Sequence, residues 1–285
     1  MINFLLLLAV VFWGLSFVAT KMALQYLNPF EIIALRLLLG SPVLYFIVAA
    51  KKIDITPKRS DIPILLITSI VLAVHFLIQA FGLIYTSATN TGWLIATIPV
   101  FIAILSRLFL TEKVGPVKLL GILIATVGAL FLISKGRLTS LEWLESVGDW
   151  LILTSCVTWA VYTIITRDLT RRYHPLAVTL AILILPALLL NAYCAYTTPI
   201  SKLLELPFKV IGALVFLGVF CLGLAQWVWL EGLSRKSATE VGVFLYIEPI
   251  VTTLGAIPIL GESINLFGIA GALLILLGVY LVQKR

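Results

Sequence analysis

The sequence predicts an all-α polytopic membrane protein in which ten transmembrane helices form two inverted five-helix repeats around a central cavity. Hydrophobic residues make up 61% of the chain and charged residues only 12%, a balance that could not cover the surface of a soluble domain with polar groups. The apolar residues fall into runs of about 20, the length that a helix needs to cross the hydrocarbon layer. A transmembrane β-barrel would instead alternate in polarity over about ten residues. The chain also repeats itself, with five spans in each copy.

The predicted spans follow one another with short connections. We place them near residues 3–22, 30–50, 62–84, 88–109 and 117–134 in the first half, and near 148–166, 175–196, 208–230, 238–260 and 264–283 in the second. Residues 1–135 then form the first repeat and residues 148–285 the second. The longest connection, of about fifteen residues, leaves no room for a soluble catalytic domain. Function is therefore expected within the membrane.

Lys and Arg are unevenly distributed between the two sides of the predicted membrane. If the N-terminus is cytoplasmic, fourteen lie in cytoplasmic loops or at the C-terminus and five on the opposite side, with Arg36 alone inside a span. Short cytoplasmic loops carry an excess of these residues, so we expect a multi-pass protein with both termini in the cytoplasm. The net charge of +7 is scattered over the loops and forms no continuous basic face, so no nucleic-acid partner is expected.

Neither the N-terminus nor the cysteines indicate processing or redox chemistry. The first apolar run has no basic flank before it and no small-residue cleavage pattern after it, so we expect the first helix to be retained. Cys156, Cys194 and Cys221 all fall inside predicted spans and lack metal-ligand spacing, which favours a packing role. We expect neither a metal nor a cofactor.

The two halves of the chain match over most of their length. At a shift of 146, Trp13, Thr20, Lys21 and Pro29 correspond to Trp159, Thr166, Arg167 and Pro175. At a shift of 150, Gly82, Ser87, Gly92, Pro99, Glu112, Gly121 and Gly128 reappear as Gly232, Ser237, Gly242, Pro249, Glu262, Gly271 and Gly278. Chance apolar similarity would not keep Pro, Glu and Gly in register for so long. Because five spans is an odd number, the second copy must enter the membrane from the opposite side.

The pattern resembles the drug/metabolite transporter superfamily, and within it the EamA-type ten-helix exporters. The residues that carry the resemblance are Trp13-Gly14, Pro29 leading to Arg36, Glu248-Pro249 and Leu260-Gly261-Glu262. The resemblance implies a basket-shaped bundle whose central cavity faces one side at a time, and export of amino acids and other small metabolites. Related branches move sugar phosphates, nucleotide sugars or lipid-related amines, so the resemblance names no substrate.

Ionisable residues within spans are the first candidates for a binding site, because each costs roughly 2.5 to 3.5 kcal/mol in mid-membrane unless it meets water or a partner. Arg36 lies about two turns inside the second span, and Glu248 lies near the middle of the ninth, before a proline that frees a backbone carbonyl. We expect both to bind opposite charges of a zwitterionic substrate. The alternative for Arg36 is a snorkelling side chain or a structural ion pair, and the alternative for Glu248 is a helix-to-helix hydrogen bond by a protonated carboxyl group. Burial favours the neutral form of a carboxyl group, so Glu248 is also a candidate for proton coupling.

Further candidates come from polar and aromatic positions. His75 and Gln79 share one face of the third span, and Gln226 in the eighth corresponds to Phe76 in the repeat. Spacings of four residues place Phe244 on the same face as Glu248, and the equivalent face of the first half carries Asn90. The aromatic walls are predicted to include Trp13, Trp93 and Trp159. Interhelical bonding of the amides and a structural histidine are the alternatives.

Two further groups are expected outside the cavity. Small residues of the fifth and tenth spans offer faces for close helix contact: Gly121, Ala125 and Gly128 in the fifth, and Gly268, Gly271, Ala272 and Gly278 in the tenth. They pack either within one chain or across a dimer, so a monomer or a weak homodimer is expected. Glu112 and Glu262 end their spans at opposite membrane faces, where a loop-bonding role is expected.

The sequence favours a secondary transporter that exports amino acids or related amines by alternating access. No catalytic constellation or phosphate-binding loop is present, which argues against an enzyme and against a self-contained ATP-driven pump. A phosphate-binding carrier should bury two or more basic residues, and only Arg36 is within a span. A carrier of sugar phosphates, nucleotide sugars or lipid-related amines is the alternative, as is a non-transporting subunit or channel.

Overall fold

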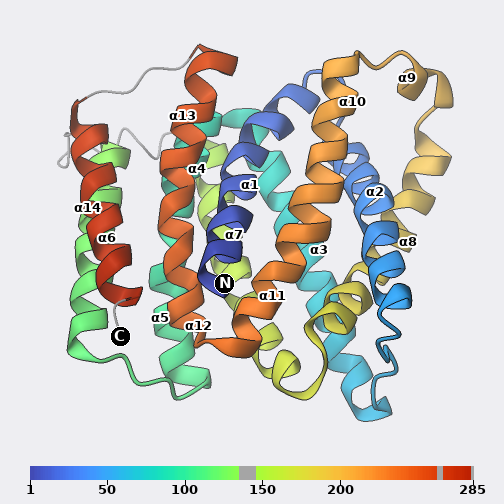
Figure 1. Cartoon of the computed structure of the whole chain (residues 1–285). Helices are drawn as coiled ribbons and strands as arrows, with labels where there is room; N and C mark the ends of the chain where they lie inside the picture. Colours follow the sequence, from blue (N-terminus) through green and yellow to red (C-terminus); the bar gives the residue numbers. More distant parts are fainter. Residues whose placement is uncertain (135–145, 262–265, 284–285) are drawn as a thin grey trace.

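The computed structural model describes residues 1–134, 146–261 and 266–283, and all regular structure in these residues is helical (Figure 1). Within these described ranges, eight apolar stretches of 22 to 28 residues are long enough to cross a membrane, and two shorter apolar helices accompany them. The predicted all-helical, multi-pass architecture is therefore confirmed. Glu262, for which a loop-bonding role is expected, lies outside the described residues.

The helices of the first half are α1 (Ile2–Ala23), α2 (Pro29–Ala50), the short η1 (Arg59–Asp61), α3 (Ile62–Tyr85), α4 (Ala88–Ile95), α5 (Ile98–Phe109) and α6 (Pro116–Ser134). Those of the second half are α7 (Val147–Arg172), α8 (Pro175–Thr197), α9 (Ile200–Leu204), α10 (Phe208–Val215), η2 (Phe216–Ala225), α11 (Gln226–Arg235), α12 (Ala238–Gly242), η3 (Val243–Ile247), α13 (Glu248–Leu260) and α14 (Leu266–Gln283). Several spans are thus built from consecutive segments: α4 with α5, α10 with η2 and α11, and α12 with η3 and α13.

Local sequence signals explain where several helices begin. Asn28 and Glu31 bond reciprocally at the start of α2, where Pro29 occupies the first turn. Reciprocal bonding of the same kind starts α7, between Ser146 and Asp149. These capping boxes satisfy backbone N–H groups that have no partner within the helix.

The fourth and ninth spans are both interrupted close to an equivalent proline. Pro99 follows the break between α4 and α5, and Pro249 follows η3, which is a 3-10 helix. Proline cannot donate a backbone hydrogen bond, and its ring clashes with the carbonyl four residues earlier. The interruptions change which side chains of these spans face the middle of the bundle.

Helices α6 and α14 lie side by side at one edge of the bundle, and α2 and α8 lie at the other (Figure 1). The small residues of α6 and α14 face each other within the chain: a Cβ added at Gly278 would lie 2.4 Å from the carbonyl oxygen of Gly121, and one added at Gly128 would lie 2.6 Å from that of Gly271. Close backbone approach of this kind is the packing mode expected of small-residue faces. Packing within one chain, the first of the two alternatives for these small residues, therefore explains their positions.

Candidate substrate cavity

A cavity in the middle of the bundle is lined from both halves of the chain. Its lining residues come from α1, α2, α3, α4, η3, α7 and the starts of α5 and α13: Trp13, Ser16, Phe17, Arg36, His75, Phe76, Gln79, Ile95, Ile98, Trp159, Leu245 and Glu248. The free volume is about 30 Å³, room for about two water molecules. Ligand pockets are usually about ten times larger. The cavity is therefore contracted in this conformation, and a substrate requires the helices to separate.

Arg36 and Glu248 bring opposite formal charges to this cavity. Both side chains are buried, at 5% and 3% exposure. The Arg36 Nε has no hydrogen-bond partner among the described residues, and the guanidinium carbon lies 4.8 Å from the centre of the Phe76 ring. A cation over an aromatic face is stabilised without losing its hydrogen-bonding capacity. Since no ion pair joins these two described residues, their polar atoms are available to a ligand.

His75 is fixed by bonds from the neighbouring span. Its Nδ1 lies 3.0 Å from the carbonyl oxygen of Ser155 and 3.1 Å from the hydroxyl of Thr158. A carbonyl oxygen only accepts, so Nδ1 carries the proton. The imidazole also packs against Trp159, with ring centres 4.9 Å apart.

The two equivalent tryptophans meet across the cavity. The rings of Trp13 and Trp159 are 5.1 Å apart and nearly perpendicular, a favourable aromatic arrangement. Trp13 is held by its indole N–H, which donates to the carbonyl oxygen of Cys221 at 2.9 Å. Cys221 belongs to η2, a π-helix, and π-helical turns are frequent at functional sites.

Six of the ten predicted site residues thus line the cavity, and four lie elsewhere. Asn90 donates to the hydroxyl of Thr86 at 3.1 Å and to the Asp149 carboxylate at 2.7 Å. Trp93 donates its indole N–H to Thr253 at 3.1 Å, within a separate apolar cluster. The structure also places Gln226 and Phe244 outside the lining, both buried in the main core.

Helix geometry explains two of these differences. The predicted face assumed a continuous α-helix through the ninth span, in which residues four apart align. The 3-10 turn of η3 has about three residues per turn, so Leu245 and Glu248 face the cavity in place of Phe244. The break after Ile95 acts likewise in the fourth span, where Ile95 and Ile98 line the cavity and Asn90 does not.

The remaining lining residues that the sequence did not single out are Ser16, Phe17 and Phe76. Each lies on a helix within four residues of a predicted site residue, at Trp13, His75 or Gln79. Helical spacing from those residues was therefore a signal for them. Phe76 carries the most information, since it is the aromatic partner of Arg36.

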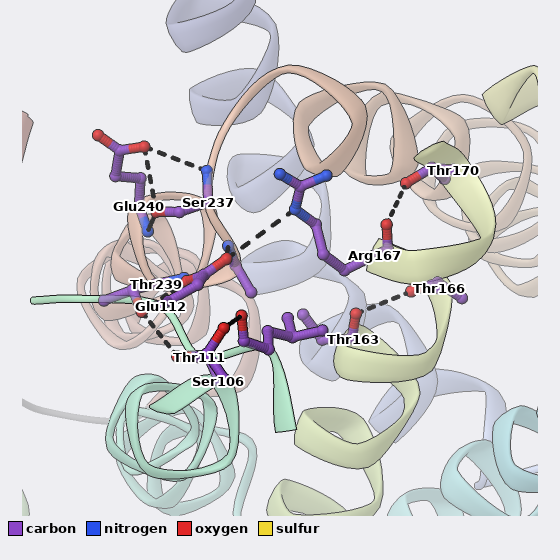
Figure 2. A network of polar contacts seen from close by, with 12 residues as sticks. Ser106, Thr111, Glu112, Thr163, Thr166, Arg167, Thr170, Ser237, Thr239 and Glu240 are labelled. Carbon is purple, nitrogen blue, oxygen red and sulfur yellow. Dashed lines mark hydrogen bonds and ion pairs between the residues drawn. The ribbon is translucent and has the colours of Figure 1, made fainter. Parts of the chain in front are cut away.

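A polar network links the ends of α5 and α7 to the start of α12 (Figure 2). The Glu112 carboxylate accepts the backbone N–H groups of Ala238 and Thr239, at 2.8 and 3.3 Å. The Nε of Arg167 approaches the same carboxylate at 4.0 Å, and the hydroxyls of Ser106 and Thr239 are 2.9 Å apart. Glu112 thus joins a loop to a helix start, away from the cavity.

Comparison with known proteins identifies the fold and the family. Residues 1–134 and 146–283 each match the EamA-like transporter family. The chain belongs to this family. The chain is therefore a carrier and not an enzyme. The predicted resemblance to the drug/metabolite transporters is confirmed.

Relatives of this EamA protein cover it almost from end to end. An uncharacterized transporter of Archaeoglobus fulgidus is 30% identical and is matched over 98% of both chains. A probable amino-acid metabolite efflux pump of Salmonella typhimurium is 26% identical, over 98% of this chain and 93% of the relative. A crystal structure with 20% sequence identity superposes with a TM-score of 0.79, covering 99% of this chain and 98% of that one. This last likeness supports the fold alone.

Proposed function

We propose that this EamA protein is a secondary exporter of small zwitterionic metabolites, amino acids or closely related amines, that works by alternating access. We further propose that it resides in the cytoplasmic membrane of a prokaryote with both termini inside, in keeping with the distribution of Lys and Arg. Similarity to the Salmonella relative, a probable amino-acid metabolite efflux pump, supports the direction and the substrate class.

The proposal rests on two opposite charges in the cavity, Arg36 and Glu248, that form no ion pair with any of the described residues. Arg36 is suited to a carboxylate, because its guanidinium can form two parallel hydrogen bonds. Glu248 is suited to an ammonium group across the cavity. Each charge is costly to bury in the membrane, and a zwitterion would neutralise both at once.

The walls of the cavity support a small organic ligand. Trp13, Trp159 and Phe76 supply aromatic faces, and Gln79 with His75 supplies polar atoms. Mostly apolar walls with a few convergent polar groups are typical of sites for small molecules.

A phosphorylated substrate is less compatible with this lining. Arg36 is the only Lys or Arg among the lining residues, and a phosphate that carries about two negative charges would leave one unpaired in the membrane. The acidic side chain of Glu248 would add repulsion.

Glu248 is also proposed as the proton carrier. A carboxyl group that alternates between a buried cavity and water can load and release one proton in each cycle. Exchange of that proton for the substrate ammonium would couple export to the proton gradient.

Uptake into proteoliposomes tests the proposal. The purified wild type is reconstituted and offered labelled amino acids, organic amines and phosphate esters, with and without a pH gradient. We expect an amino acid or amine to be transported, with gradient-dependent stimulation that Glu248→Gln lacks. Transport of phosphate esters alone would contradict the proposal, as would no transport of any amino acid or amine by a protein that is monodisperse after extraction.

A further inference from the structure

The cavity takes lining residues from both repeats, but the first repeat contributes most of them. Three pairs of equivalent positions line it from both halves: Trp13 with Trp159, Ile95 with Leu245, and Ile98 with Glu248. Every other lining residue comes from the first half: Ser16, Phe17, Arg36, His75, Phe76 and Gln79.

The equivalents of these six residues in the second half are buried and do not line the cavity. Shifts of 146 and 150 identify them as Tyr162, Thr163, Ile182, Ala225, Gln226 and Trp229. Each is at most 1% exposed. Trp229 adjoins the cavity directly, because its ring lies 5.4 Å from that of Trp13 and 5.7 Å from that of Trp159.

This closed half contains polar atoms that the fold does not satisfy. The Thr163 hydroxyl, the Gln226 Oε1 and the indole N–H of Trp229 have no hydrogen-bond partner among the described residues, and neither has the indole N–H of Trp159. The Gln226 amide uses only its nitrogen, which donates to the Tyr162 hydroxyl at 2.6 Å. Buried polar groups without partners destabilise a protein, so apolar residues would serve packing better.

We propose that Thr163, Gln226 and Trp229, with the shared Trp159, form the second half of the substrate site, closed here and opened when the carrier faces the other side of the membrane. Inverted repeats provide two nearly equivalent packings around one site. When the halves exchange their packings, the first half closes and its equivalents in the second half line the cavity. The inference rests on the proposed transport function and specifies how the same ligand is held in the opposite state.

Apart from the shared Glu248, the first half of the site carries a charge, at Arg36, and the second half is neutral. It offers two indole N–H donors, a hydroxyl and an amide oxygen, and Ile182 stands where the first half has Arg36. Glu248 is shared, so the substrate ammonium stays near it while the carboxylate exchanges the guanidinium for neutral N–H donors. Charge-assisted hydrogen bonds are roughly twice as strong as neutral ones, so the carrier binds its substrate more weakly in the opposite state.

Thiol labelling tests whether the second half opens. Thr163→Cys is made in a background that lacks the three native cysteines, reconstituted, and treated on both sides of the membrane with a charged methanethiosulfonate reagent. Thr253→Cys is the matched control, because Thr253 is equally buried but bonds to Trp93 in the separate cluster. We expect labelling at position 163 and none at position 253. No labelling at 163 in a variant that transports would overturn the inference.

A pair of tryptophan substitutions tests the hydrogen-bonding role. Trp229→Phe and Trp227→Phe each remove one indole N–H that has no partner among the described residues, but Trp227 lies beside Lys51, away from the cavity. The loss of one substrate hydrogen bond predicts an about three- to tenfold slower transport for Trp229→Phe, and no such loss for Trp227→Phe. Equal rates in the two monodisperse variants would contradict the inference.

The two proposals can fail separately. If the wild type transports no amino acid or amine, the substrate class fails, and labelling at position 163 still reports whether the second half opens. If the wild type transports but Thr163→Cys is inactive, the comparison of transport by Trp229→Phe and Trp227→Phe tests the inference instead.

Discussion

Arg36→Met is the substitution that best separates a binding role from a structural role. A methionine retains most of the apolar stem and removes the charge. Because Arg36 has no ion-pair partner among the described residues and its Nε is unbonded, we expect the variant to be more stable than the wild type and inactive in transport. If Arg36 instead formed a structural ion pair, Arg36→Met would be less stable than the wild type.

The expected size follows from two opposing contributions. Placing an arginine at the middle of a membrane helix costs about 2.5 to 3.5 kcal/mol. The cation–π interaction with the Phe76 ring offsets this cost by about 2 kcal/mol when the pair is desolvated. Removal of the charge should therefore stabilise the fold by roughly 1 kcal/mol, which corresponds to a rise of about 2–4 °C in the melting temperature of a protein somewhat smaller than this one.

The assay compares apparent melting temperatures of purified variants in one detergent, followed by transport measurements on the same preparations. Arg172→Met is the matched control, because Arg172 forms ion pairs with Asp61 and Asp168 and should gain no stability when its charge is removed. A melting temperature for Arg36→Met several degrees below that of the wild type would refute the reasoning and restore the structural alternative.

Three other outcomes follow from the structure. Glu248→Gln should abolish the stimulation of uptake by a pH gradient, and undiminished stimulation would exclude Glu248 as the proton carrier. Gly278→Val would bring a side chain against the carbonyl oxygen of Gly121 and should destabilise the fold by about 1–3 kcal/mol; Gly212→Val, in open space, should show no such steric loss when melting is compared. Glu112→Ala removes the bonds to the start of α12 and should cost about 0.5–2 kcal/mol, a drop in melting temperature that an unchanged value would contradict.

The architecture was predictable because membranes restrict the possible folds so strongly. Every backbone polar group must be satisfied within the bilayer, so long apolar runs predict helices. The register of Pro99 with Pro249, and of Gly121 with Gly271, then indicates the repeat. The buried charges could also be located, since the burial of Arg36 and Glu248 follows from their place within apolar spans.

The exact faces of the interrupted spans could not be predicted in the same way. Proline indicates that a helix is disturbed, but not whether the result is a 3-10 turn or a break. Phe244 and Asn90 were therefore placed on a face that the real helices turn away from the cavity. Trp93 was assigned to the cavity because of its residue type, and only tertiary packing reveals its bond to Thr253.

Competition between matched ligands tests the central claim most directly. An amino acid that the wild type transports is compared with its decarboxylated amine and with its N-acetyl derivative, which retain the side chain but lose one charge each. The paired roles of Arg36 and Glu248 predict that the intact zwitterion inhibits uptake far better than either analogue. Equal inhibition by all three would contradict a site that binds both charges.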